Sequence, residues 1–332
     1  MLLVDWIGRS VRGVSPIMTA GCVAAAVLIG AGAVEAQVQT EQSSAQIYPW
    51  DRKSMGDGSR KIADGKTHVC VLAGLHGELD EWTALASSRF PTIPGGALGG
   101  YEGASWNLGG WGDDGTGYYD RDVGGAAVCV PFSEFLVDAG GSVEISRFGM
   151  GEVSTPQGFD CNSRVANVEM WPGYTSTFIA GFRGGFYGTN SRITVLPPES
   201  PSASTWVSVE NDSCDVPQFE GVAYSLRVGI VDAPRFPFYY PLTNDVSNHW
   251  RRPIDVKDDH RMQELLAPTS RALCYFVDIG GDFLGNGEWA QIQPRMVDGV
   301  EWWEIDANAV DGQVVGQVQC LLYDQRTPPD PL

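Results

Sequence analysis

Aromatic rings and carboxylates alternate in one Gly-rich segment, residues 108–125, which reads LGGWGDDGTGYYDRDVGG. Aromatic rings can stack on the apolar faces of sugars, and carboxylates accept hydrogen bonds from hydroxyl groups. The segment therefore predicts a loop that binds a glycan or another cell-surface polymer through Trp111, Tyr118 and Tyr119.

The same segment holds four carboxylates that could coordinate calcium, Asp113, Asp114, Asp120 and Asp122. Residues 109–117 nearly match the calcium-binding nonapeptide GGxGxDxUx, except that Thr116 replaces its large apolar residue. That motif works by stacking many turns that share their ions, whereas this chain has one copy. Carboxylates in a flexible loop can also hold a single calcium ion. Calcium is therefore the one cofactor that the sequence suggests, and a solvated acidic loop without metal is the alternative.

A second group of aromatic and basic residues lies between residues 236 and 252. Tyr239 and Tyr240 end an aromatic run, and Trp250 and Arg251 stand in the densest basic segment of the chain, HWRR. These residues do not recur at matching places elsewhere, so no shared requirement of the fold explains them. We therefore count them among the candidate ligand-binding residues.

Catalytic motifs are absent from the sequence. It has no GxSxG, HExxH or GxxxxGK[ST] pattern, and no GxGxxG between a strand and a helix, of the kinds that place a nucleophile, a zinc ion or a nucleotide. The four histidines are His68, His76, His249 and His260. A Ser-His-Asp triad is recognised by its geometry and not by its spacing, so a hydrolase stays as an alternative with unknown catalytic residues.

Three similar segments position these residues. They begin at Cys70, Thr177 and Cys274, and each has glycine at its eighth position, an aliphatic or aromatic residue at its tenth, a later tryptophan and a closing strand. The tryptophans are Trp106, Trp206 and Trp303, which we expect in the core. Each copy predicts four short strands with glycine at the turns.

The sequence thus predicts an all-β protein of three diverged four-stranded antiparallel modules, at residues 67–130, 176–228 and 271–325. We expect small sandwiches or barrels in a row, because long connections, residues 131–175 and 229–270, separate the copies; a pseudo-threefold trefoil is the alternative. The second connection contains one predicted short helix, Asp258–Leu266, which ends before Pro268. Residues 37–66 and 326–332 are polar and are predicted to form tails.

The cysteines predict a set of disulfides. Cys70 and Cys129 open and close the first module, and Cys274 and Cys320 open and close the third. The middle module has Thr177 and Ser225 at the matching places, so both partners are missing together. This pattern predicts the bridges Cys70–Cys129 and Cys274–Cys320. It leaves Cys161 and Cys214 to pair with each other.

The N-terminus predicts export. Two arginines precede an apolar stretch that ends in Val34-Glu35-Ala36, so residues 1–36 read as a signal peptide cleaved after Ala36. Lipid anchoring at Cys22 is the alternative, and we expect no membrane insertion after the signal is removed. The expected location is therefore secreted or periplasmic.

The net charge of the chain limits the classes of partner that it can bind. Cleavage removes Arg9, Arg12, Asp5 and Glu35, so the net charge stays at −19. Such a chain repels phosphate backbones, which argues against nucleic acid as a partner. The favoured function is extracellular binding or adhesion to a glycan or cell-surface polymer. A structural or assembly component with protein partners and a secreted hydrolase are the alternatives.

Overall fold

The structure is a computed structural model that describes residues 44–79, 82–88, 105–113, 123–146, 153–154, 164–172, 175–186, 188, 191–196, 204–211, 219–230, 237–240, 242, 251–283, 285 and 287–326. Their elements are almost all β-strands, which confirms the all-β class. Among these residues, no helix is long and apolar enough to cross a membrane.

The twelve predicted module strands are present, four in each module. They are β3 (His68–His76), β4 (Trp82–Ser88), β5 (Ser105–Asp113) and β6 (Gly124–Pro131); β10 (Thr175–Gly184), β11 (Arg192–Leu196), β12 (Ser204–Asn211) and β13 (Glu220–Ile230); and β16 (Ala272–Asp282), β17 (Trp289–Val297), β18 (Val300–Ala309) and β19 (Gln313–Leu322).

The segments predicted as a tail and as connections add two strands before each module. They are β1 (Gln46–Asp51) and β2 (Gly58–Asp64), β7 (Gly141–Ser146) and β9 (Arg164–Pro172), and β14 (Arg251–Lys257) and β15 (His260–Pro268), with the two-residue β8 (Val153–Ser154) beside β13. β1, β2 and β15 could not be predicted as strands because their composition is polar. They lie at sheet edges, where many side chains face water.

The predicted helix at Asp258–Leu266 is wrong. Asp258 and Asp259 both have positive φ, 37° and 59°, and form the two-residue turn that joins β14 to β15. Mirror-image turns of this kind match the twist of a hairpin. The one α-helix in the described residues is α1 (Arg52–Met55), and a 3-10 turn, η1, covers Phe132–Glu134.

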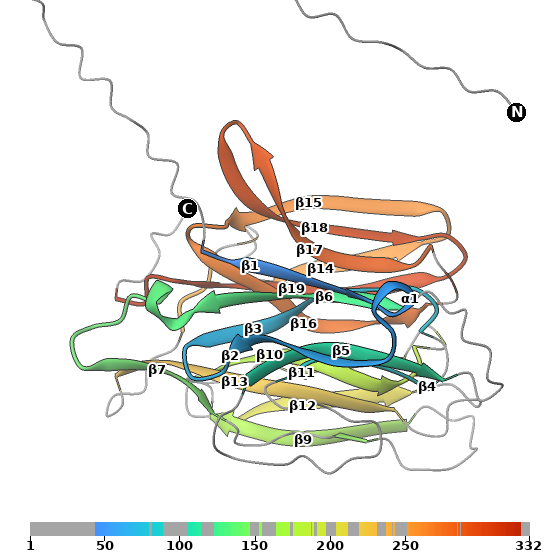
Figure 1. The fold of residues 1–332 in the computed structure, drawn as a ribbon, viewed down its shortest axis with the longest axis horizontal. Helices are drawn as coiled ribbons and strands as arrows, with labels where there is room; N and C mark the ends of the chain where they lie inside the picture. The colour runs from blue at the N-terminus through green and yellow to red at the C-terminus, as the bar shows by residue number, and fades with distance from the viewer. Residues whose placement is uncertain are drawn as a thin grey trace, which may run out of the picture. The chain divides into compact units, whose positions relative to one another are not determined.

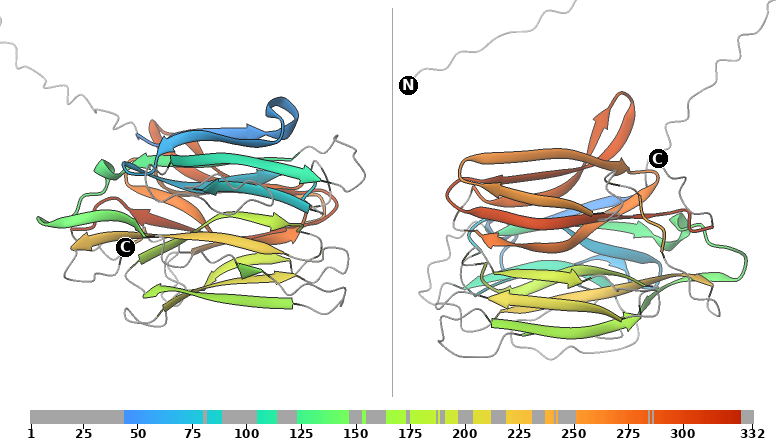
Figure 2. Two further views of the ribbon diagram at one scale, coloured as in Figure 1. Left: turned by 60° about the horizontal axis from the view of Figure 1, so that its bottom comes forward. Right: turned by 180° about the vertical axis from the view of Figure 1, so that it is seen from behind.

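The strands form three sheets with one common order (Figure 1). Sheet I is β1-β6-β3-β17-β18-β15, sheet II is β2-β5-β4-β10-β13-β7, and sheet III is β14-β19-β16-β11-β12-β9. Each sheet contains two strands of one module and two of another, which meet at β3–β17, β4–β10 or β11–β16, and at each edge lies a strand that precedes a module. The views in Figure 2 follow the same strands from other sides. The modules therefore share their sheets, and none closes a sheet alone.

The backbone conformation at the eighth position of each module explains why that residue is glycine. Gly77, Gly184 and Gly281 have φ of 98°, 110° and 123°, a region that residues with a side chain rarely adopt. Two residues further on, the three segments are joined by a ring of backbone hydrogen bonds: Leu79 N to Phe283 O (3.0 Å), Phe283 N to Phe186 O (3.1 Å) and Phe186 N to Leu79 O (2.5 Å). This ring ties all three modules together.

Aromatic side chains from all three modules fill the core. The ring of Trp106 lies 5.5 Å from that of Tyr224, and the ring of Phe178 lies 6.0 Å from that of Tyr275. Trp106 and Trp303 are buried, as predicted. Trp206 is 41% exposed, so its predicted core position is wrong. The reason is register: Trp206 points to the side of β12 opposite to the buried Thr205 and Val207.

Two of the three predicted disulfides are present, Cys70–Cys129 and Cys274–Cys320. Each joins directly paired residues of the first and last strands of its module, with Cα atoms 4.1 and 4.0 Å apart. Thr177 and Ser225 are paired in the same way in β10 and β13, and their hydroxyl oxygens are 2.9 Å apart. Cys161 and Cys214 lie outside the described residues.

Candidate functional site

Most residues of the predicted aromatic and acidic loop lie outside the described residues. Trp111 and Asp113 belong to the end of β5, where the structure describes the backbone. Asp114, Tyr118, Tyr119, Asp120 and Asp122 lie beyond it, and so does Trp250 of the second group. Among the side chains that the structure describes, no three His, Cys, Asp or Glu residues are grouped so as to hold a metal ion.

Tyr239, Tyr240 and Arg251 are described, and each forms hydrogen bonds with strands of sheet II or sheet III. The hydroxyl groups of Tyr239 and Ser176 lie 3.1 Å apart, and burial raises the pKa of Tyr239. Tyr240 N donates to the carbonyl of Cys320, at 3.0 Å. The guanidinium of Arg251 donates to Gln317 Oε1 and to the backbone carbonyl of Val195, both at 3.2 Å. The bonds of Tyr239 and Tyr240 fasten the segment before β14 to β10 of sheet II and β19 of sheet III, and Arg251, the first residue of β14, bonds to β19 and β11.

A cleft of about 350 Å³ lies on the outer face of sheet I, where the first and third modules join. Its lining comes from four strands of that sheet: Pro49, Trp50, Asp51, Gly74, Leu75, His76, Gly125, Ala126, Trp289, Ala290 and Gln291. The sheet register explains the hollow. Gly74 and Ala126 are cross-strand partners on this face, and Gly74 is also the partner of Gln291. Two small residues side by side leave the space open between larger neighbours.

His76 and Asp51 form one side of the cleft. The His76 ring lies over Gly124, where an added Cβ would come within 2.3 Å of the ring and 2.8 Å of the backbone carbonyl oxygen of Trp50, so a side chain there would force both to shift. His76 Nε2 is 3.8 Å from Asp51 Oδ2, and both side chains are partly exposed. Asp51 also accepts a hydrogen bond from Ser54 N (2.9 Å) and so caps α1. The cleft therefore offers an imidazole and a carboxylate held in fixed places.

Trp289 forms the opposite side. It is the cross-strand partner of His76, and the guanidinium carbon of Arg261 lies 5.2 Å from the centre of its ring. Such a contact between a cation and an aromatic ring is attractive and restricts both side chains. Trp289 thus presents a positioned aromatic surface to the cleft.

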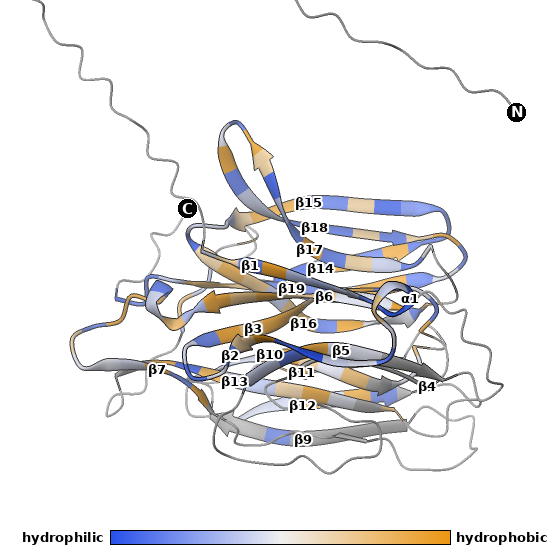
Figure 3. Ribbon diagram, viewed as in Figure 1, coloured by the Kyte–Doolittle hydropathy of each residue, from blue (hydrophilic) through white to orange (hydrophobic). Residues whose placement is uncertain are grey.

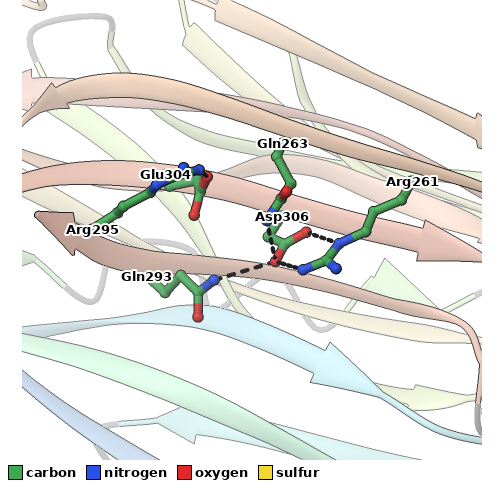
Figure 4. A network of polar contacts seen from close by, with 6 residues as sticks. All are labelled: Arg261, Gln263, Gln293, Arg295, Glu304 and Asp306. Carbon is green, nitrogen blue, oxygen red and sulfur yellow. Dashed lines mark hydrogen bonds and ion pairs between the residues drawn. The ribbon is translucent and has the colours of Figure 1, made fainter. Parts of the chain in front are cut away.

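A network of charged and amide side chains continues the outer face beyond Trp289 (Figure 4). Asp306 is 2% exposed and accepts bonds from Arg261 Nε (2.9 Å), Gln263 Nε2 (3.2 Å) and Gln293 Nε2 (3.3 Å). Glu304, at 3% exposed, pairs with Arg295 on the neighbouring strand. Because both buried carboxylates are paired, they hold the arginine and amide groups in place on the surface.

The corresponding place in sheet III is filled. There Asp278 stands where sheet I has Gly74, at the same kind of register shift between the first and last strands of a module. Asp278 pairs with Arg192 and accepts a hydrogen bond from Thr194 Oγ1, at 2.9 Å. The open cleft is therefore a feature of sheet I that the matching position of sheet III lacks.

Sequence reasoning missed this site because its residues belong to different modules. Trp289 and His76 stand 213 positions apart in the chain, and nothing in their local patterns links them. The one usable signal was the pair Glu288-Trp289, which matches Glu81-Trp82 of the first module. Comparison of the chain with protein-family models, with curated proteins and with solved structures finds no match.

We predict that Asp51→Ala lowers the free energy of unfolding in a pH-dependent way. Burial opposes ionisation of Asp51, but hydrogen bonds from Ser54 and the nearby His76 outweigh it and hold the pKa of Asp51 below its ordinary value of 3.8. The carboxylate therefore stabilises the fold above pH 3.8, and this contribution is lost as the pH falls through the lower folded pKa. Removing a helix cap costs about 1 kcal/mol. Urea denaturation should show that difference at pH 7 and a smaller one near pH 2; equal differences at both pH values would contradict the assignment.

Proposed function

We propose that this protein is an exported binding protein that recognises a glycan at the cleft of sheet I. The observation that carries the proposal is the combination of Trp289, which is held by Arg261, with polar side chains around a floor of glycine and alanine. Pyranose rings have an apolar face that stacks on indole, and hydroxyl groups that bond to carboxylates, amides and imidazole. The cleft provides each of these partners.

Export is supported by two independent features of the chain. The N-terminal sequence has the charge and apolar pattern of a signal peptide. Both described disulfides join strands in the core of a module, and such bonds persist in oxidising compartments. We therefore assign the protein to the periplasm or the exterior of the cell.

We further propose that the three modules arose from one ancestral unit. The common strand order of the sheets, the positive-φ glycines and the paired positions Cys70–Cys129, Thr177–Ser225 and Cys274–Cys320 support this origin. After duplication, the junctions between modules could change independently, and sheet I acquired the open cleft.

Trp289→Ala tests the binding site. We expect it to weaken binding to neutral glycans on an array at least about tenfold, which corresponds to ~1.4 kcal/mol, because the stacking surface is lost. Calorimetry with the oligosaccharides that score on the array measures the change.

The matched control is Trp206→Ala. Trp206 is 41% exposed and lies on β12 of sheet III, so its removal should leave glycan affinity unchanged. Equal loss in both variants would show a general effect of exposed tryptophans and would reject the cleft as the site. Release of shortened sugars during incubation would instead indicate a hydrolase, and capture of a protein without any glycan signal would favour an assembly component.

A further inference from the structure

The outer face of sheet I does not end at the cleft. Residues that alternate along β17, namely Trp289, Gln291, Gln293 and Arg295, share one side of the strand, because side chains in a strand point alternately to its two faces. Their cross-strand partners on β18 are Asn308, Asp306, Glu304 and Trp302, and the pairing runs without a register shift. One continuous strip therefore leads from Trp289 to Trp302.

The bonds within the strip confirm that these side chains share a face. Arg261 lies over Trp289 and bonds Asp306; Gln293 bonds the same carboxylate. Arg295 pairs with Glu304, next to Trp302 in the alternation. Figure 4 shows Gln293 and Arg261 converging on Asp306, with Arg295 and Glu304 beside them.

The two tryptophans are separated by more than a disaccharide can bridge. Arg295, the partner of Trp302, lies six residues beyond Trp289, a distance of about 20 Å at roughly 3.3 Å per residue. Trp302 is partly exposed. It lies in the part of the β17–β18 hairpin where β17 no longer pairs with β3 and pairs only with β18. In Figure 1 the strands β17 and β18 can be followed into a hairpin that extends beyond the neighbouring strands.

Charge along the strip is balanced. Arg261 pairs with Asp306, Arg295 pairs with Glu304, and the carboxylate of Asp51 lies beside His76. The described part of the strip therefore has no surplus of positive charge for an anionic polymer, and the chain as a whole carries a net charge of −19, which repels one.

Resting on the proposed function, we infer that the ligand is an extended, unbranched and uncharged polysaccharide that lies along β17 and β18 and stacks on Trp289 at one end and Trp302 at the other. The amides of Gln291 and Gln293 and the exposed edges of Arg261 and Arg295 bond its hydroxyl groups between the two rings. Two stacking points on one rigid face make the second contact intramolecular, so affinity rises with chain length.

The test uses cello-, xylo- and manno-oligosaccharides from dimer to hexamer, titrated by calorimetry into the full mature chain. At least one neutral series should bind with an affinity that rises about tenfold or more from dimer to hexamer. Trp302→Ala should remove this rise, so that the hexamer binds about as tightly as the dimer. Trp289→Ala should weaken every length, and Trp206→Ala should change none.

The outcomes separate the two proposals. If a dimer and a hexamer bind equally, or if Trp302→Ala leaves hexamer affinity intact while Trp289→Ala abolishes binding, the extended ligand is wrong and the glycan site stands. If oligogalacturonates bind more tightly than every neutral series, the uncharged ligand is wrong. If no oligosaccharide binds in a manner sensitive to Trp289→Ala, the proposed function itself fails. Melting temperatures of the three variants near that of the wild type confirm that each is folded.

Discussion

Replacing Thr177 and Ser225 together by cysteine is expected to create a third cross-strand disulfide and to raise the stability of the protein. The two residues are directly paired in β10 and β13, as Cys70 and Cys129 are in β3 and β6. Closing a loop of 48 residues stabilises by about 4 kcal/mol on the chain-entropy model. Loss of the hydrogen bond between the two hydroxyl groups offsets about 1 kcal/mol of this stabilisation. We expect a net gain of about 3 kcal/mol.

Thermal unfolding under non-reducing conditions measures this gain as a rise in Tm of roughly 5–10 °C. A reducing agent provides one control, because it should remove the rise that the new bond causes. The single variant Thr177→Cys provides another, since it loses the hydroxyl pair without gaining a bridge and should not be stabilised. Peptide mapping must find the two introduced cysteines bonded to each other; if they are bonded and Tm is unchanged, the structural equivalence of the three modules does not extend to this pair.

Trp303→Ala is expected to destabilise the fold by about 3–5 kcal/mol. The indole is 1% exposed, and its Nε1 donates to the carbonyl of Ala272 at 2.7 Å. The substitution therefore leaves a cavity and an unpaired buried carbonyl. Trp106 donates in the same way to His68 O, also at 2.7 Å, which indicates that each of these modules uses its tryptophan as a buried link to its first strand.

The adjacent residue supplies the matched control for this experiment. Trp302 is partly exposed on the opposite side of β18, so Trp302→Ala should cost about 1 kcal/mol or less. Urea denaturation of both variants compares the two faces of one strand directly. Equal losses of stability at the two positions would contradict the register of β18, and with it the face on which the glycan strip is placed.

The strands with continuous apolar sequence could be predicted, and the polar ones could not. β3 and β16 are buried along almost their whole length, so their apolar runs stood out; β3 is mainly hydrophobic in Figure 3, whereas β15 is mainly hydrophilic. β15 begins with alternating exposed and partly buried residues after two aspartates. The two aspartates before β15 and the proline at its end also suit a helix, and only the pairing with β18 makes the segment a strand.

The candidate site illustrates the same limit. The aromatic and acidic loop could be found by composition, because its residues are neighbours in the chain. The cleft could not, since Asp51, His76 and Trp289 become neighbours only when β3 pairs with β17. Asp, His and Trp are ordinary residues on surface strands. They line a cleft here because the small residues beside them leave space.

The amino-acid sequence determined the strands of the modules, the positions of the glycines that need positive φ, and the pairing of four cysteines, because these depend on local periodicity and on repetition along the chain. The tertiary structure alone decided that each sheet is shared by two modules. Hydrogen bonds between strands have no local signature that identifies the partner strand, so the chain could not reveal which module β3 would join. That choice places a tryptophan of the third module beside a histidine of the first and creates the cleft on which the proposed function rests.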